Sequence, residues 1–358
     1  MTFNKIAVLG LGKIGHLAAE LLNEAGFDVL GIDQVEYSGT AKFSTKALDL
    51  SDPIEVEKGL SEVEAVLSCL PYHLNIKVAE VAHKLKLNYF DLTEDVPTTQ
   101  RIIELSKTSE AVMAPQCGLA PGFVGIVAAD LAKRFDSCRS LRLRVGALPR
   151  NPTGILGYAF NWSPVGVVNE YLNDCEVIEN GVHKWVSPME WTERIFVDGN
   201  ELEAFTTSGG LGTICETYLG KIDNIDYKTI RYPGHVDLMN FFFHELLMRD
   251  RKKEAGEILT NAKPPVDDDV VIVHVAAEGE KQSKLVRDEF VRSYYPRELV
   301  GKERTAIAWT TAGSVASVIE LVSSQKLKSS GFIKQEEISF EDFCQTKTGS
   351  LFLDGFDS

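Results

Sequence analysis

Residues 6–33 read IAVLGLGKIGHLAAELLNEAGFDVLGID, and this stretch decides the fold of the first domain. An apolar strand leads into a Gly-x-Gly-x-x-Gly turn, an amphipathic helix, a second apolar strand and then Asp33. Gly10 permits a tight turn, Gly12 lets backbone N–H groups approach a pyrophosphate, and Gly15 lets the helix lie close to the sheet. The helix N-terminus favours an anion through its unpaired N–H groups and its dipole. This order predicts a dinucleotide-binding site rather than a purely structural turn.

Asp33 also predicts which dinucleotide is used. A carboxylate at the end of the second strand accepts hydrogen bonds from the adenosine ribose hydroxyls and repels a 2′-phosphate. The segment that follows, QVEYSGTA, contains Glu36 and has no Lys or Arg before Lys42. We therefore expect NAD rather than NADP.

Further strand-like and helical runs alternate up to about residue 114, which predicts a Rossmann-type, doubly wound parallel sheet of the α/β class. Sites in such sheets form beyond the carboxyl ends of the strands. The loops at 70–73, 91–95 and 116–122 follow strands and are expected at that edge. The residues predicted to bind the cofactor are Gly10, Gly12, Lys13, Ile14, Gly15, Asp33, Leu70 and Pro71.

Composition narrows the class of protein. The chain has 358 residues, 44% of them hydrophobic, which suits two domains better than one. A formal net charge of −15 argues against nucleic acid or an anionic membrane as the partner, because both attract positive charge. We expect no apolar run of about 18 residues that spans a membrane, no signal peptide before the first strand, and a cytoplasmic location.

The six cysteines and seven histidines show no metal-ligand spacing, so reduced thiols and no metal site are expected. The three aspartates at 267–269 are interpreted as a solvated turn. After Gly122, longer helices mix with strands of alternating polarity, which predicts a second, α+β domain. The tail after Gly349 is expected to be loose.

Four later segments carry a more specific pattern: CGLAPG at 117–122, ALPRNPTGILGYAFNWSPVGVVNEY at 147–171, EAFTTSGGLGT at 203–213 and KTIRYPGH at 228–235. Together they resemble the saccharopine dehydrogenase family, most of all its lysine 6-dehydrogenase branch. The resemblance spans nearly the whole chain in order.

The resemblance implies a Rossmann domain at 1–122, an inserted α/β substrate and dimerisation domain at 123–301, and a C-terminal segment at 302–358 that returns to the Rossmann domain. It also implies a homodimer and hydride transfer at a carbon–nitrogen bond of an amino acid. Two departures separate this chain from NADP-dependent, glutamate-forming members: Ala120 stands where they carry Asp, and the acidic Asp33 stands where they carry a basic residue. We therefore expect oxidation of L-lysine at the ε-carbon to the semialdehyde. A saccharopine or carboxynorspermidine reductase, or a sensor or scaffold that binds NAD without turnover, remains an alternative.

Three kinds of group are candidates for the chemistry. Arg231, in the family segment, is expected to bind the substrate carboxylate, since a guanidinium matches it bidentately, although an ion pair is the alternative. Asp91 and Glu94 are candidates to orient an ammonium or to take its proton, or else to cap a helix. His235 is a candidate proton relay near neutral pH, or a structural histidine. Tyr158, Trp162 and Tyr232 are expected to line the substrate pocket or to belong to the core.

Overall fold

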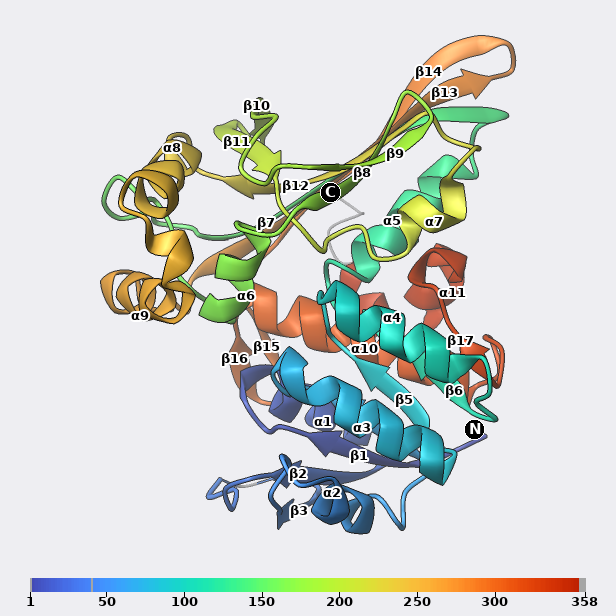
Figure 1. Ribbon diagram of the computed structural model, residues 1–358. Coiled ribbons are helices and arrows are strands. Elements are labelled where there is room, and N and C mark those ends of the chain that lie inside the picture. The colour runs from blue at the N-terminus through green and yellow to red at the C-terminus, as the bar shows by residue number, and fades with distance from the viewer. Residues whose placement is uncertain (1, 40, 354–358) are drawn as a thin grey trace. The chain divides into compact units, whose positions relative to one another are not determined.

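The computed structural model describes residues 2–39 and 41–353 (Figure 1). The chain divides into two compact units: residues 1–126 with 308–358 form unit 1, and residues 127–307 form unit 2. The divisions after Ile126 and Ile307 fall a few residues beyond the boundaries predicted at 122 and 301. The C-terminal segment therefore belongs to the same unit as the glycine turn.

Unit 1 is built on a seven-stranded sheet in the order β17-β6-β5-β4-β1-β2-β3. Every neighbouring pair is parallel, and the chain winds outward from β1 in both directions. The reversal of winding lies between β1 and β4, where such sheets bind dinucleotides. The doubly wound sheet predicted from the sequence is confirmed. Its strands are β1 (Lys5–Leu9), β2 (Asp28–Asp33), β3 (Ser44–Ala47), β4 (Ala65–Ser68), β5 (Asn88–Asp91), β6 (Val112–Ala114) and β17 (Gly331–Phe332).

Helix α1 (Lys13–Glu24) follows the glycine turn, and its apolar residues at helical spacing, such as Leu17 and Leu21, are buried as predicted. Asp52 caps α2 (Pro53–Gly59) by accepting from Ile54 N, and Asp95 caps α4 (Val96–Ser106) by accepting from Thr98 N, in accord with the preference for Asp at helix N-caps. The remaining helices that lie wholly or partly in unit 1 are α3 (Tyr72–Leu85), α5 (Phe123–Ala132), α10 (Ala306–Ser323) and α11 (Phe340–Gln345).

Helix α10 corrects the expectation that no apolar run is long enough to span a membrane. Its 18 residues have a mean hydropathy of 1.3, and 83% of that stretch is buried inside the structure. The hydroxyl of Ser314 donates to the Gly118 carbonyl at 2.8 Å, and that of Ser323 to the Phe3 carbonyl at 2.8 Å. A helix buried to this extent is typical of a protein core. Its length and hydropathy alone are therefore weak evidence that it spans a membrane.

The tail after Gly349 is not loose over its described part. Residues Gly349–Phe352 form a 3₁₀ helix, and Phe352 is fully buried. The Phe352 ring stacks on Phe123, with centroids 4.3 Å apart, and lies 5.2 Å from the Trp309 ring. Phe352, flanked by Leu351 and Leu353, anchors this turn by aromatic packing. Residues 354–358 lie outside the described part of the chain.

Unit 2 is built on a mixed sheet in the order β10-β11-β12-β7-β13-β14, with β8 paired to β12 and β9 to β8. Strand β12 is parallel to β7, and the other pairs are antiparallel. The predicted α+β character is confirmed. The strands are β7 (Ser137–Pro149), β8 (Cys175–Glu179), β9 (Val182–Val186), β10 (Glu193–Val197), β11 (Asn200–Thr206), β12 (Asn224–Arg231), β13 (Asp269–Lys281) and β14 (Lys284–Tyr294), with a separate pair β15 (Arg297–Leu299) and β16 (Lys302–Arg304).

The helices of unit 2 are short. The stretch 235–245 is not one continuous α-helix: α8 (His235–Asn240) is followed by a turn of π-helix, η1 (Phe241–Glu245). The others are α6 (Pro164–Glu170), α7 (Ile214–Tyr218), the 3₁₀ turn η2 (Met248–Asp250) and α9 (Lys252–Ala262). An aromatic-rich core that includes Tyr158, Phe160, Tyr171, Phe205 and Phe243 packs beside them.

The aspartates at 267–269 are not all solvated. Asp267 and Asp268 are exposed, but Asp269 is fully buried. Its carboxylate accepts hydrogen bonds from the backbone N–H groups of Ala306 and Ile307 at 2.5 and 3.0 Å. The solvated-turn interpretation is therefore wrong for Asp269, which caps the start of α10.

Candidate active site

The glycine turn has the shape that a dinucleotide requires. Gly10 has a φ of +86°, and a Cβ there would lie 3.0 Å from the Cys69 carbonyl oxygen. A Cβ on Gly15 would lie 1.8 Å from the Gly10 carbonyl oxygen, so only glycine lets α1 approach the sheet. A Cβ on Gly12, by contrast, would meet nothing within 4 Å. The open side of Gly12 leaves room for a pyrophosphate.

The start of α1 leaves its first N–H groups available. Gly12 is the N-cap residue and provides no side-chain hydrogen bond, and the first turn, which begins with Lys13 and Ile14, holds no acidic residue. Leu70 borders this turn, since its Cδ2 would lie 3.0 Å from a Cβ on Gly10, and Pro71 caps α3. These residues fit a bound pyrophosphate, because a helix N-terminus without a capping side chain favours an anion.

Asp33 is bonded directly to the glycine turn. Its Oδ2 accepts from Leu11 N at 2.6 Å and its Oδ1 from Gln34 N at 2.7 Å. The half-buried carboxylate therefore connects the end of β2 to the turn after β1. Among the described residues from Gln34 to Phe43, Lys42 is the only Lys or Arg. Its Nζ lies 3.7 Å from Glu24 Oε1.

Asp91, predicted as a catalytic candidate, is a positioning residue. Its side chain is fully buried and accepts from the Tyr89 hydroxyl at 2.7 Å, Thr93 N at 2.9 Å and Gln116 N at 3.0 Å. Burial raises the pKa of Asp91 to about 6, against the lowering effect of these hydrogen bonds. The carboxylate thus ties the loop after β5 to the loop after β6, with both oxygens occupied.

Glu94 lies three residues further along the same loop and is half-buried. Its carboxylate is hydrogen-bonded by its own backbone N–H and forms no ion pair within the described residues, and burial raises its pKa to about 7. A carboxyl group that titrates near neutral pH and is not held by neighbours suits a general base. Of the two acidic candidates, Glu94 is the one that this geometry favours.

Arg231, at the end of β12 in unit 2, is buried among aromatic rings. Its Nε donates to the Tyr171 hydroxyl at 2.8 Å and its Nη1 to the Ile230 carbonyl at 2.8 Å, while Nη2 lies 3.5 Å from the Tyr158 hydroxyl. The guanidinium carbon is 4.5 Å from the Tyr158 ring centroid. Burial alone would lower the pKa of Arg231. Electrostatic interactions with Tyr158, Tyr171 and Glu170 raise this pKa by more than burial lowers it, so the guanidinium stays charged. Within the described residues no carboxylate forms a direct salt bridge with it, and Glu170 stabilises its charge from a longer distance.

His235 lies in the same cluster, but it is not a relay near neutral pH. Its Nδ1 lies 3.0 Å from the Leu156 carbonyl oxygen, so we assign the proton to Nδ1, and its Nε2 then accepts from the Tyr171 hydroxyl at 3.0 Å. Burial and the neighbouring Arg231 lower the pKa of His235 to about 3. The prediction of a proton relay is therefore wrong: the neutral ring orients the Tyr171 hydroxyl toward Arg231.

Of the predicted pocket aromatics, Tyr158 and Trp162 join the Arg231 cluster and Tyr232 does not. Tyr158 is buried and shares a hydrogen bond with Trp162, which is half-buried. The Tyr232 hydroxyl instead donates to the Pro149 carbonyl at 2.9 Å.

Two residues of the cluster escaped prediction. Tyr171 links Arg231 to His235, and Glu203 accepts from Gly234 N at 2.9 Å and Val236 N at 2.8 Å, which fixes the turn between β12 and α8. Both stand in the quoted segments 147–171 and 203–213. The sequence could have indicated Glu203, because an acidic residue in a family segment suggests a hydrogen-bond partner, here the Tyr-Pro-Gly-His turn at 232–235.

Two family models match consecutive parts of the chain. The model described as saccharopine dehydrogenase NADP binding domain matches residues 6–114, and that described as saccharopine dehydrogenase C-terminal domain matches residues 118–351. The NADP of the first description differs from the NAD predicted from Asp33.

Curated relatives are distant and longer. Saccharopine dehydrogenase [NADP(+), L-glutamate-forming] of Schizosaccharomyces pombe is 24% identical over 312 residues, which cover 79% of this chain and 66% of that protein. The mitochondrial alpha-aminoadipic semialdehyde synthase of Bos taurus is 28% identical over 197 residues, which cover 50% of this chain and 21% of that protein. The chain thus spans two thirds or less of the length of these relatives.

Among solved structures, the apo saccharopine dehydrogenase (L-Glu forming) of Saccharomyces cerevisiae superposes with a TM-score of 0.74. The alignment covers 98% of this chain and 97% of that one at 15% identity, which shows a shared fold. Because the two family models together match nearly the whole length from residue 6 to residue 351, the chain belongs to the saccharopine dehydrogenase family.

Proposed function

We propose that this protein is an NAD-dependent oxidoreductase that acts on a carbon–nitrogen bond of an amino acid, oxidising L-lysine at its ε-carbon to the semialdehyde. The observation that carries the proposal is Arg231, a buried guanidinium that forms no salt bridge within the described residues. A buried charge is costly unless an opposite charge or strong hydrogen bonds compensate it. A substrate carboxylate would supply a direct anionic partner for this guanidinium.

The protein's own groups divide the remaining work. A dinucleotide held by the glycine turn and Asp33 would supply a hydride acceptor for the oxidation of the carbon that carries the nitrogen. Glu94 takes a proton from the substrate ammonium, since its pKa near 7 lets it accept one at neutral pH. Tyr158 and Tyr171 hold the guanidinium of Arg231 in one orientation, so that the carboxylate binds without reordering the side chain.

The choice of NAD rests on Asp33. Its carboxylate lies at the end of β2 and accepts two short backbone hydrogen bonds, from Leu11 N and Gln34 N. A 2′-phosphate next to this charge would need a cation, and the loop after β2 offers Lys42 beside Glu24. The names of the family model and of a relative contain NADP, which supports the opposite preference. Measuring kcat/KM with NAD and with NADP distinguishes the two preferences.

A second candidate is reversible saccharopine cleavage, which the names of the relatives favour. Saccharopine carries more carboxylates than lysine and needs more cationic partners. The loops at 70–75, 91–96 and 116–122, at the strand ends of unit 1, contain no Lys or Arg. This composition favours the substrate with fewer carboxylates.

The experiment that tests the proposal is an absorbance assay of NADH formation with purified protein and a panel of amino acids. Turnover of an amino acid supports an enzyme, whereas NADH binding without turnover of any substrate indicates a sensor or scaffold. We also propose that the protein is a homodimer in the cytoplasm. Sedimentation velocity would measure its oligomeric state.

A further inference from the structure

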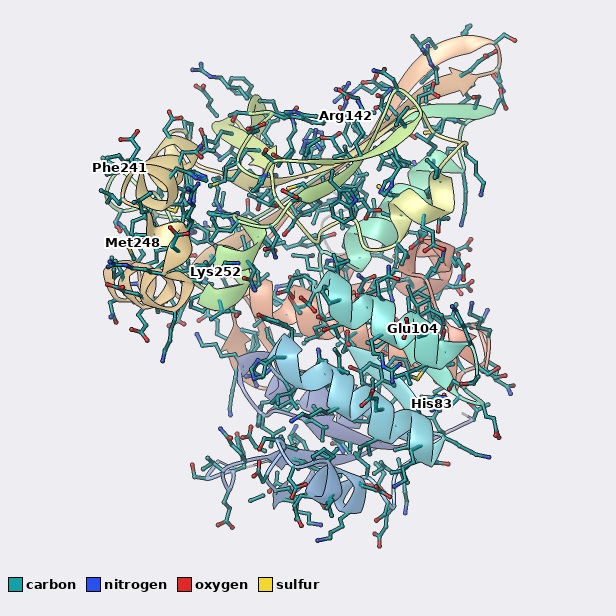
Figure 2. All side chains as sticks on the ribbon, in the orientation of Figure 1. His83, Glu104, Arg142, Phe241, Met248 and Lys252 are labelled. Atoms are coloured by element: carbon teal, nitrogen blue, oxygen red, sulfur yellow. The ribbon has the colours of Figure 1, made fainter. Side chains whose placement is uncertain are left out.

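A cavity of about 580 Å³ lies within unit 2 and is lined by residues from the end of α6, the β9–β10 loop, α8, η1, η2 and the start of α9. Its buried part is apolar, with Tyr171 and Met189 almost inaccessible to solvent. Its exposed part is charged. The lining residues used below are Tyr171, Leu172, Pro188, Met189, Glu190 and Lys252. Figure 2 labels Lys252 where α9 begins.

Two uncommon backbone features frame this cavity. Met189 has a φ of +56°, a left-handed conformation that costs free energy for a non-glycine residue. Thr206 holds it there: its carbonyl accepts from Met189 N at 2.7 Å, and its Oγ1 accepts from Glu190 N at 3.0 Å. The turn of π-helix at Phe241–Glu245 contributes His244 to the cavity lining. Strained residues and π-helical turns cluster at functional sites, so both features indicate a binding site.

The charged groups at the cavity are of opposite sign, and two of them have no partner. Arg249 is engaged, since its Nη1 lies 3.3 Å from His244 Nδ1 and its Nε 4.0 Å from Asp250 Oδ1. The side chains of Glu190 and Lys252, by contrast, form no hydrogen bond or ion pair within the described residues. The cavity therefore offers a free carboxylate and a free ammonium above an apolar floor.

We propose that this cavity is a regulatory site for a free α-amino acid with an apolar side chain. Lys252 binds the carboxylate of the ligand, Glu190 binds its ammonium, and the side chain lies against Leu172, Pro188 and Met189. The volume suits a small ligand of this class. L-lysine, with its distal charge, suits the apolar floor poorly, which separates this ligand from the proposed substrate.

Tyr171 connects the cavity to the buried arginine. Tyr171 is one of the residues that line the cavity, and its hydroxyl accepts from Arg231 Nε at 2.8 Å and contacts His235 Nε2 at 3.0 Å. A ligand that packs against this ring alters the freedom of the group that orients Arg231. This regulatory part rests on the proposed function, whereas binding in the cavity does not.

Isothermal titration calorimetry with L-norleucine as the probe tests the binding. We expect saturable binding to the full chain, with hexanoate and hexylamine, which lack one of the two head groups, at least tenfold weaker. Glu190→Gln and Lys252→Gln should each weaken norleucine binding at least tenfold. Glu257→Gln and Lys284→Gln, which change exposed residues outside the cavity, are the matched controls and should bind as the wild type does.

Three results would overturn the proposal. Absence of norleucine binding, or equal binding by the Glu190 and Lys252 variants, removes the site. Equal loss of norleucine binding in Arg231→Lys places the ligand at the arginine instead. If substrate turnover is found, saturating norleucine should change the substrate KM at least threefold in the wild type and not in Glu190→Gln; an unchanged KM overturns the regulatory role. Failure of turnover itself speaks against the proposed function and leaves the calorimetric result intact.

Discussion

The Nε of Arg231 donates a hydrogen bond of 2.8 Å to the hydroxyl of Tyr171, and both side chains are buried. The hydroxyl can accept this bond because its own proton points to the neutral ring of His235. The chain of bonds fixes the orientation of a charged group that forms no direct salt bridge within the described residues. A substrate carboxylate is the direct anionic partner that we propose for it.

Replacing Arg231 with lysine should lower kcat/KM for the amino-acid substrate by ten- to a thousandfold. The charge remains, but the two-pronged geometry that matches a carboxylate is lost, at a cost of about 1.4 to 4 kcal/mol. NADH affinity, measured by fluorescence titration, should stay unchanged because the glycine turn belongs to unit 1. Arg194→Lys, at an exposed arginine, is the control. An equal fall in NADH affinity would show that Arg231 is structural.

The cofactor preference should depend on the charge of Asp33. We expect kcat/KM with NAD to exceed that with NADP at least tenfold, since a phosphate beside a carboxylate costs about 1.4 kcal/mol or more. Asp33→Asn should narrow the ratio, and Asp28→Asn, at the exposed start of the same strand, should not. Equal use of both cofactors by the wild type would refute the preference.

Glu94 should set the pH dependence of turnover. Its carboxyl has a pKa of about 7, so kcat/KM should fall about tenfold per pH unit below that value, where the base is protonated. Glu94→Gln should lower kcat/KM at least a hundredfold and remove this dependence between pH 5 and 7, as about two decades are typical of a general base. Glu62→Gln, on the exposed surface, should keep the wild-type profile. An unchanged profile in the Glu94 variant would exclude it as the base.

His235 should make the protein sensitive to acid. The folded chain keeps the ring neutral down to about pH 3, whereas the unfolded chain binds a proton below about pH 6.5. Between these values the unfolded state binds the extra proton, so the free energy of unfolding falls as the pH falls, by up to about 1.4 kcal/mol per unit. Asp91 and Glu94 act in the opposite direction, because their pKa values are raised.

Comparing the wild type with His235→Gln isolates the contribution of His235 to the pH dependence of stability, because Asp91 and Glu94 are present in both proteins. Urea unfolding at pH 7, 6 and 5 should show a steeper loss of stability in the wild type than in the variant. His73→Gln, at an exposed histidine, should follow the wild type. Parallel losses in the wild type and His235→Gln would contradict the neutral, buried ring.

Much of unit 1 could be predicted because its signals are local. Glycine spacing, the apolar face of α1 and the alternation of strands and helices each depend on neighbours in sequence, and the parallel sheet order confirms them. The role of Asp91 could not be predicted this way. An acid at a strand end has the same local pattern whether it faces a ligand or accepts bonds from a distant loop, as Asp91 does from Gln116.

The same reason explains the errors in unit 2 and in the tail. The pKa of His235 depends on Arg231 and on burial, and the sequence shows neither contact. Asp269 ends an acidic run and Phe352 follows Gly349 and Ser350, yet each contacts partners from other parts of the chain: Ala306 and Phe123 respectively. Tertiary contacts overrode the local composition at all three positions.

The most direct test of the central claim is to measure NADH and ammonia together with L-lysine, ornithine, saccharopine and carboxynorspermidine as substrates. An enzyme that oxidises the ε-carbon of lysine releases one ammonia for each NADH, and we predict this with lysine and little turnover of saccharopine. Rapid oxidation of saccharopine, with lysine inert and no ammonia released, would contradict the assignment.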